Sequence, residues 1–122
     1  MKRLLLIDDD EELLPVLAAY LSRLGYEVET ASDGVIGVER FHAKPCDLVV
    51  TDLILPNREG IETILQLRKE RPELPIIAMS GGLGNSPQYL GLAKRLGAKC
   101  ALLKPFSPES LKEAIERLLP PG

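Results

Sequence analysis

The sequence has little of what marks several large classes of protein. Its two cysteines, Cys46 and Cys100, show neither CxxC nor zinc-ligand spacing, which excludes a disulfide scaffold and indicates a reducing compartment with both thiols in the core. The 15 Lys and Arg residues are scattered and the net charge is only −3, so no basic stripe for direct nucleic-acid binding is present. The apolar run 4–7 ends at three acids and is far too short for a signal peptide or a membrane span. We therefore expect a soluble, cytoplasmic protein that contacts neither nucleic acid nor membrane.

The size and composition of the chain indicate one domain. With 122 residues, 45% of them apolar and 27% charged, the chain can form a single hydrophobic core of ordinary size. We expect one domain over residues 1–122. The last residues, Pro120 to Gly122, either end the protein or begin a linker.

Strand and helix patterns alternate five times along the chain. Four continuous apolar runs are typical of strands buried on both faces, and a weaker alternating run indicates an edge strand: 4–7, 48–50, 76–79 and 101–103, with 28–31 as the weaker run. Helical spacing separates them, for example at Leu14, Leu17, Ala18 and Leu21, and at Leu111, Ala114, Ile115 and Leu118. This pattern predicts an α/β fold with a parallel sheet, either a flavodoxin-like doubly wound (βα)5 fold of strand order 2-1-3-4-5 or a truncated Rossmann order. Five strands favour the flavodoxin-like order.

Several residues mark the expected helix ends. Ser86-Pro87 and Ser107-Pro108 each place a capping hydroxyl before a proline at the first helical position. Gly25 and Gly97 stand where the first and fourth helices are expected to end. Pro15 is tolerated only if the first helix starts within about one turn upstream, and the sequence leaves that start open.

Polar residues follow four of the predicted strands at their carboxyl ends. Asp8 and Asp9 follow the first strand, Asp52 the third, Ser80 the fourth and Lys104 the fifth. In the 2-1-3-4-5 order the strand order reverses between the first and third strands, so the three aspartates are expected to converge there. Carboxylates held close together repel one another unless they take up protons or bind a cation. We interpret them as a Mg²⁺ site, because Mg²⁺ is commonly held by a few carboxylates together with water and phosphoryl oxygens.

This arrangement suits phosphoryl transfer onto the central carboxylate, Asp52. In this interpretation Asp9 binds the metal directly, Asp8 holds it largely through water, and the backbone carbonyl of Ile54 is a further ligand. Ser80 and Lys104 would contact phosphoryl oxygens. Taken alone, the acidic run 8–12 is more typical of a solvated helix start. We favour a metal site because Asp52 and Lys104 are expected at the same edge of the sheet.

Four motifs together resemble the receiver domain of bacterial response regulators: Ile7 to Asp10, Thr51 to Pro56 with Gly60, Met79-Ser80-Gly81, and Lys104-Pro105-Phe106. The resemblance runs from residue 2 to about residue 119. It implies two-component signal transduction, in which the phosphoryl group comes from a sensor histidine kinase or a histidine phosphotransfer protein. It also implies a cis peptide before Pro105 and no turnover of an external metabolite. The output would be a contact with a downstream target protein or with an effector domain outside these residues. A homodimer is a further possible partnership.

The chain departs from the resembled family at three positions. Ala101 stands three residues before Lys104, where receivers commonly carry an aromatic residue that moves on activation. Ile54 and Gly82 occupy the positions that influence hydrolysis of the aspartyl phosphate in the family, and neither side chain can orient a water molecule, which predicts a long-lived phosphoryl state.

Two other functions stay under consideration. Ala101 suggests an interaction module of receiver fold that does not use phosphorylation, which Mg²⁺ binding would test. A flavodoxin-like small-molecule binder would need a phosphate-binding loop after the first strand, where this chain has acids.

Overall fold

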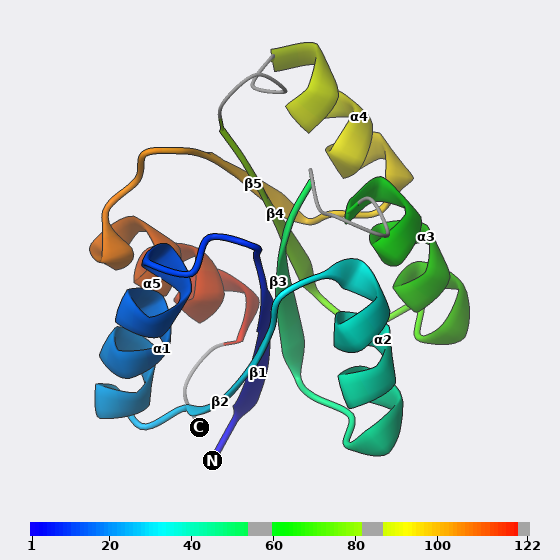
Figure 1. The fold of residues 1–122 in the computed structure, drawn as a ribbon. Helices are drawn as coiled ribbons and strands as arrows, with labels where there is room; N and C mark the ends of the chain where they lie inside the picture. Colours follow the sequence, from blue (N-terminus) through cyan, green and yellow to red (C-terminus); the bar gives the residue numbers. More distant parts are fainter. Residues whose placement is uncertain (54–59, 82–86, 120–122) are drawn as a thin grey trace.

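Five strands alternate with five helices along the described chain. The structure is a computed structural model that describes residues 1–53, 60–81 and 87–119. Its strands form one parallel sheet in the order β2-β1-β3-β4-β5, which confirms the predicted flavodoxin-like topology (Figure 1). The strands are β1 (Arg3–Ile7), β2 (Glu27–Ala31), β3 (Leu48–Asp52), β4 (Ile76–Ser80) and β5 (Cys100–Leu103). The helices are α1 (Leu13–Arg23), α2 (Gly34–Ala43), α3 (Gly60–Glu70), α4 (Pro87–Leu96) and α5 (Pro108–Leu118).

Helices cover both faces of the sheet. Figure 1 shows α1 and α5 on one face of the sheet and α2, α3 and α4 on the other. Leu4 and Leu6 of β1 belong to the buried cluster that includes residues of α1 and α5, whereas Leu5 and Ile7 belong to the cluster that includes residues of α2, α3 and α4. All four side chains are almost completely buried. A strand with apolar residues on both sides is what a sheet between two helical layers requires, because successive side chains point to opposite faces.

The two edge strands differ from the buried centre of the sheet. The strand over 28–31 was expected at an edge, and β2 is indeed the outermost strand on one side. The run 101–103 was expected to be buried on both faces, which is wrong, because β5 is the other edge and Leu103 is 51% exposed. For the same reason Cys100 is only half-buried, whereas Cys46 lies in the core as expected.

The helix ends follow the local sequence signals. The Ser107 hydroxyl accepts a hydrogen bond from the Ser110 N–H at 3.1 Å, and Pro108 begins α5. Gly25 and Gly97 have φ angles of 102° and 135°, a backbone region that glycine tolerates best. Because α1 begins at Leu13, Pro15 lies in its first turn, where its missing N–H costs little. Ser86 lies outside the described residues.

The register of the strands brings their carboxyl ends to one edge. Ile7 pairs with Thr51, Asp52 with Met79, and Ser80 with Leu103. The residues that follow these strands therefore meet above the centre of the sheet. Among the described residues, none of the helices combines the length and the apolar character that crossing a membrane requires.

Candidate functional site

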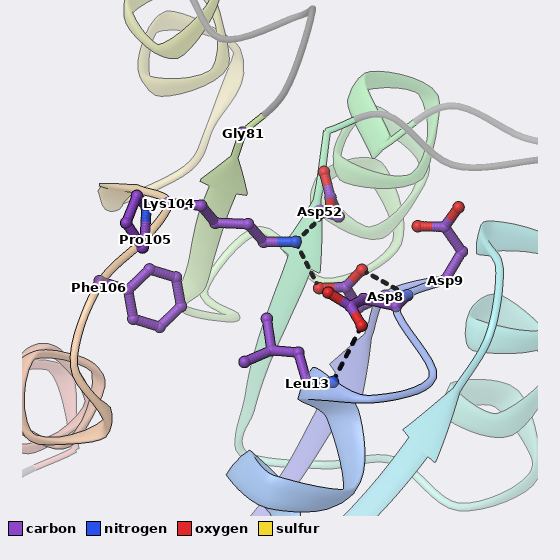
Figure 2. Close-up of a pocket in the computed structure, with 9 residues that line it drawn as sticks. Asp8, Asp9, Leu13, Asp52, Gly81, Lys104, Pro105 and Phe106 are labelled. Carbon is purple, nitrogen blue, oxygen red and sulfur yellow. Dashed lines mark hydrogen bonds and ion pairs between the residues drawn. The ribbon is translucent and has the colours of Figure 1, made fainter.

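Three aspartates meet at this edge, as the strand order predicted. One carboxylate oxygen from each of Asp8, Asp9 and Asp52 lies within 4.8 Å of the others. The side chains of Asp8 and Asp52 are buried, with 0% and 9% of their surface exposed, and Asp9 faces solvent. Figure 2 shows that Asp8 and Asp9 come from the loop after β1 and Asp52 from the end of β3.

The loop after β1 is held by its own carboxylates. Asp8 Oδ1 accepts a hydrogen bond from the Asp10 N–H at 3.0 Å. Asp10 Oδ1 in turn accepts hydrogen bonds from the N–H groups of Glu12 and Leu13, both at 3.0 Å. These two bonds lower the pKa of the Asp10 carboxyl, because they stabilise its charged form. Asp10 therefore caps the start of α1, a role that sequence analysis missed although an acid before a helix is its usual signal.

Lys104 links the two buried carboxylates. Its Nζ donates hydrogen bonds to Asp8 Oδ2 at 2.7 Å and to Asp52 Oδ2 at 2.8 Å (Figure 2). Burial alone would lower the pKa of the Lys104 ammonium, but the bonds to Asp52 and Asp8 outweigh it and raise that pKa. Burial raises the pKa of the Asp8 carboxyl, and the negative charge of Asp52 raises it further. The hydrogen bond from Lys104 lowers this pKa but does not cancel the rise. The ammonium is thus firmly charged and holds two acids together.

These groups line a cavity of about 620 Å³. Its lining combines polar and apolar residues: Asp8, Asp9, Asp10, Leu13, Asp52, Gly81, Lys104, Pro105 and Phe106. Leu13, Pro105 and Phe106 form an apolar wall beside the acids, which the sequence patterns did not reveal. The Lys104-Pro105 peptide is cis, as the family resemblance implied.

Two residues expected at the site remain untested. Ser80 ends β4 and is fully buried, and its backbone carbonyl accepts the Lys104 N–H at 2.7 Å. It adjoins the cavity without being part of the described lining, so its expected contact with a phosphoryl group stays a prediction. Ile54, expected to offer a carbonyl ligand, lies outside the described residues.

A glycine lies directly against the backbone of Asp52. A Cβ atom on Gly60 would stand 2.0 Å from the Asp52 carbonyl oxygen and 2.6 Å from the Leu53 Cα. The Gly60 N–H also donates to the Leu53 carbonyl at 3.0 Å. The start of α3 can therefore pack onto the end of β3 only without a side chain at this position.

The donor set fits a small, hard cation. Carboxylate oxygens are the ligands that Mg²⁺ prefers, at about 2.0–2.1 Å from the ion. Oxygens on opposite sides of such an ion are about 4 Å apart, so three carboxylates within 4.8 Å of one another are near the spacing required. Three carboxylates and the Lys104 ammonium together carry two negative charges, which one divalent cation would neutralise.

Comparison with known proteins identifies relatives of the whole described fold. A family model, the response regulator receiver domain, matches residues 4–116. The alkaline phosphatase synthesis transcriptional regulatory protein PhoP of Bacillus subtilis is 36% identical over 97% of this chain, which corresponds to 48% of that protein. The CpxR homolog of Haemophilus influenzae, also a transcriptional regulatory protein, is 34% identical over 98% of this chain and 51% of its own. The chain thus spans about half the length of these curated relatives.

Solved structures show the same architecture. A CheY-like response regulator receiver domain protein from Methanospirillum hungatei has a TM-score of 0.89 at 32% identity, over 97% of this chain and 94% of that one. A response regulator receiver domain protein from Clostridium thermocellum has a TM-score of 0.89 at 28% identity, over 98% and 94% of the two chains.

Proposed function

Because the chain belongs to the receiver domain family of two-component response regulators, we propose that it accepts a phosphoryl group on Asp52 from a phosphohistidine. The donor would be a sensor histidine kinase or a histidine phosphotransfer protein. One observation carries the proposal: the Asp52 carboxylate lies in an acidic cavity and is held 2.8 Å from the Lys104 ammonium. A carboxylate nucleophile beside a fixed cation suits phosphoryl transfer, where positioning and charge neutralisation supply most of the catalysis.

Asp8, Asp9 and Asp52 would hold a Mg²⁺ ion in this function, with Asp9 as a direct ligand and Asp8 acting largely through water. When bound, the ion would neutralise carboxylate charge and the charge of phosphoryl oxygens. The Ile54 carbonyl is proposed as a further ligand on the family resemblance alone. The support for the metal is the clustering of the three carboxylates, two of them buried.

The transfer step is a displacement at phosphorus. An Asp52 carboxylate oxygen forms a bond to phosphorus while the phosphorus–nitrogen bond to the donor histidine breaks. The electron pair of that bond stays on the imidazole, which leaves as neutral histidine after taking a proton from solvent. Lys104 would remain beside Asp52 and donate to a phosphoryl oxygen, and Ser80 would contact another. No external metabolite is turned over.

The output is proposed to be a contact with another protein. The relatives are named as transcriptional regulators and are about twice as long, so a downstream effector domain or a separate target protein would receive the signal. Direct nucleic-acid binding by these residues is not proposed, since their basic residues are scattered. The cytoplasmic location and the oligomeric state stay predictions.

Intact mass spectrometry tests the proposal. The protein is incubated with acetyl phosphate and Mg²⁺, and we expect the mass of one phosphoryl group to be added. The gain should disappear in Asp52→Asn and when Mg²⁺ is chelated. Asp47→Asn is a matched control, because Asp47 is exposed and accepts the Arg3 N–H at the opposite end of the sheet.

One alternative has a specific observation in its favour. Ala101 occupies the position where receivers commonly have an aromatic residue, which fits an interaction module that does not depend on phosphorylation. Such a module would show no phosphoryl gain with acetyl phosphate or with a cognate kinase.

A further inference from the structure

Asp10 forms hydrogen bonds in two directions, to the loop after β1 and to helix α1. Its N–H donates to Asp8 Oδ1 at 3.0 Å. Its own Oδ1 accepts the N–H groups of Glu12 and Leu13, also at 3.0 Å. We infer that Asp10 is a positioning residue, whose side chain fixes the loop that presents Asp8 and Asp9 to a cation. This inference rests on the Mg²⁺ site of the proposed function.

Asp9, the proposed direct ligand, depends on its neighbours for its position. Its side chain is exposed and forms no hydrogen bond or ion pair within the part of the chain that the structure describes. The backbone on either side of it is anchored instead. On one side the Asp8 N–H donates to the Ala31 carbonyl at 3.1 Å, and on the other the Asp10 carbonyl accepts the Leu14 N–H at 3.1 Å. How firmly residue 10 is held therefore decides how well the Asp9 carboxylate is aimed.

The Asp10 side chain provides that hold at the start of α1. The first N–H groups of a helix have no partner within the helix, and a carboxylate just before them is among the best groups to satisfy them. Asp10 Oδ1 satisfies two such groups. Without these bonds the first turn of α1 would fray, and residue 10 would lose its fixed place beside Asp8.

The contact between residue 10 and Asp8 completes the fixing of a buried carboxylate. Lys104 Nζ holds Asp8 Oδ2 at 2.7 Å, and the Asp10 N–H holds Oδ1. With one bond on each oxygen, the Asp8 carboxylate cannot rotate freely. Removing a group that orients metal ligands typically weakens metal binding by about 10- to 100-fold. We therefore expect the loss of the Asp10 side chain to weaken Mg²⁺ binding.

The test compares Asp10→Ala with Asp10→Asn. Asparagine keeps a side-chain oxygen and caps a helix about as well as aspartate does, whereas alanine has no acceptor. Both substitutions remove the same charge, so the difference between them reports the hydrogen bonds alone. We expect Asp10→Ala to bind Mg²⁺ about 10-fold more weakly than Asp10→Asn in a calorimetric titration.

Asp33 provides a matched control, because it caps α2 with the same chemistry. Its side chain accepts the Ile36 N–H at 2.8 Å, and it is not among the residues that line the cavity. Asp33→Ala should be less stable in urea than Asp33→Asn, and the two should bind Mg²⁺ equally. If Asp10→Ala is also less stable than Asp10→Asn but binds Mg²⁺ equally well, Asp10 is only a helix cap and the inference is wrong.

A second readout needs no metal. The backbone amide of residue 10 is present in every variant and donates to Asp8 in the wild type. We expect its protection against hydrogen exchange, corrected for the intrinsic rate of each residue type, to be about fivefold lower in Asp10→Ala than in Asp10→Asn. Equal protection would contradict the inference. If the wild type binds no Mg²⁺, the proposed metal site is wrong, and this amide still tests whether the side chain holds residue 10 beside Asp8.

Asp10→Gly guards against an alanine variant that does not fold. Glycine before a helix costs much less stability than alanine, although it too offers no side-chain acceptor. Its Mg²⁺ affinity should therefore fall below that of Asp10→Asn, as for Asp10→Ala. A folded Asp10→Gly protein that binds Mg²⁺ as tightly as Asp10→Asn would overturn the inference.

Discussion

Lys104→Met removes one charge from the site and keeps the length of the side chain. The Lys104 ammonium forms ion pairs with Asp8 and Asp52, and the exposed fractions of the Lys104, Asp8 and Asp52 side chains are 19%, 0% and 9%. Without the ammonium, three carboxylates would face one another with no compensating cation from the described residues of the site. Breaking a buried ion pair by removing one partner leaves an uncompensated buried charge, which is strongly destabilising.

The expected loss is about 3 kcal/mol of the free energy of unfolding, at the lower end of the range for such pairs. We take the lower end because Asp8, whose pKa is already raised by burial, can take up a proton and limit the cost. In a domain of this size a loss of about 3 kcal/mol lowers the melting temperature by roughly 12 °C. Mg²⁺ should stabilise both proteins, by about 2.7 kcal/mol at 100 times the dissociation constant. It should stabilise Lys104→Met more at the same concentration, because that variant keeps the three carboxylates without the ammonium that competes with the ion.

Urea unfolding followed by circular dichroism, with and without Mg²⁺, measures the effect. Lys112→Met is the matched control, because Lys112 forms a surface ion pair with Glu116 at 3.9 Å and its loss should change stability by less than about 1 kcal/mol. If Lys104→Met is as stable as Lys112→Met in a chelator, the ammonium does not hold the acids together. If Mg²⁺ stabilises neither the wild type nor Lys104→Met, the three carboxylates are not the metal site.

Three further outcomes are expected. Burial raises the pKa of the Cys46 thiol to about 11, so its contribution to stability is complete below pH 9 and is lost between pH 9 and 11. That loss amounts to about 3 kcal/mol. Cys46→Ala should remove this part of the pH dependence. If the free energy of unfolding in urea falls equally between pH 9 and 11 in Cys46→Ala and in the wild type, the prediction is wrong. Ser107→Ala should cost about 1 kcal/mol through the lost cap of α5, and unchanged urea unfolding would exclude a stabilising cap. Phosphorylated Asp52 should decay slowly, because Ile54 and Gly82 cannot orient water by their side chains. A half-life of seconds by intact mass would refute this.

The topology and the meeting of the acids followed from the sequence by general rules. Buried apolar runs such as 48–50 indicate strands between two helical layers, and five βα units favour one strand order. That order places the ends of β1 and β3 side by side, so the sequence alone predicts that Asp8 and Asp52 lie close together.

Position within the sheet and local hydrogen bonding were harder to foresee. The run 101–103 is as apolar as a central strand, yet β5 has a neighbour on only one side, and composition does not distinguish these cases. Within the acidic run, Asp8 and Asp10 look alike in sequence. The structure of the loop shows that Asp8 accepts a hydrogen bond from Lys104, whereas Asp10 accepts hydrogen bonds from N–H groups at the start of α1.

The surroundings of the individual glycines could not be predicted from the sequence. Gly60, Gly81 and Gly91 are the same residue type in the sequence, yet Gly60 begins α3, Gly81 follows β4 and Gly91 lies within α4. A side chain at Gly60 would strike the backbone of Asp52, one at Gly81 would strike the stem of Lys104, and one at Gly91 would meet open space among the described atoms. Gly60 thus lies against the backbone of Asp52, the proposed phosphoacceptor, and Gly81 lies against the side chain of Lys104. A site of this kind is specified by the small residues that let its elements approach one another as much as by the charged groups themselves, so Gly60→Ala should lower the free energy of unfolding in urea far more than Gly91→Ala.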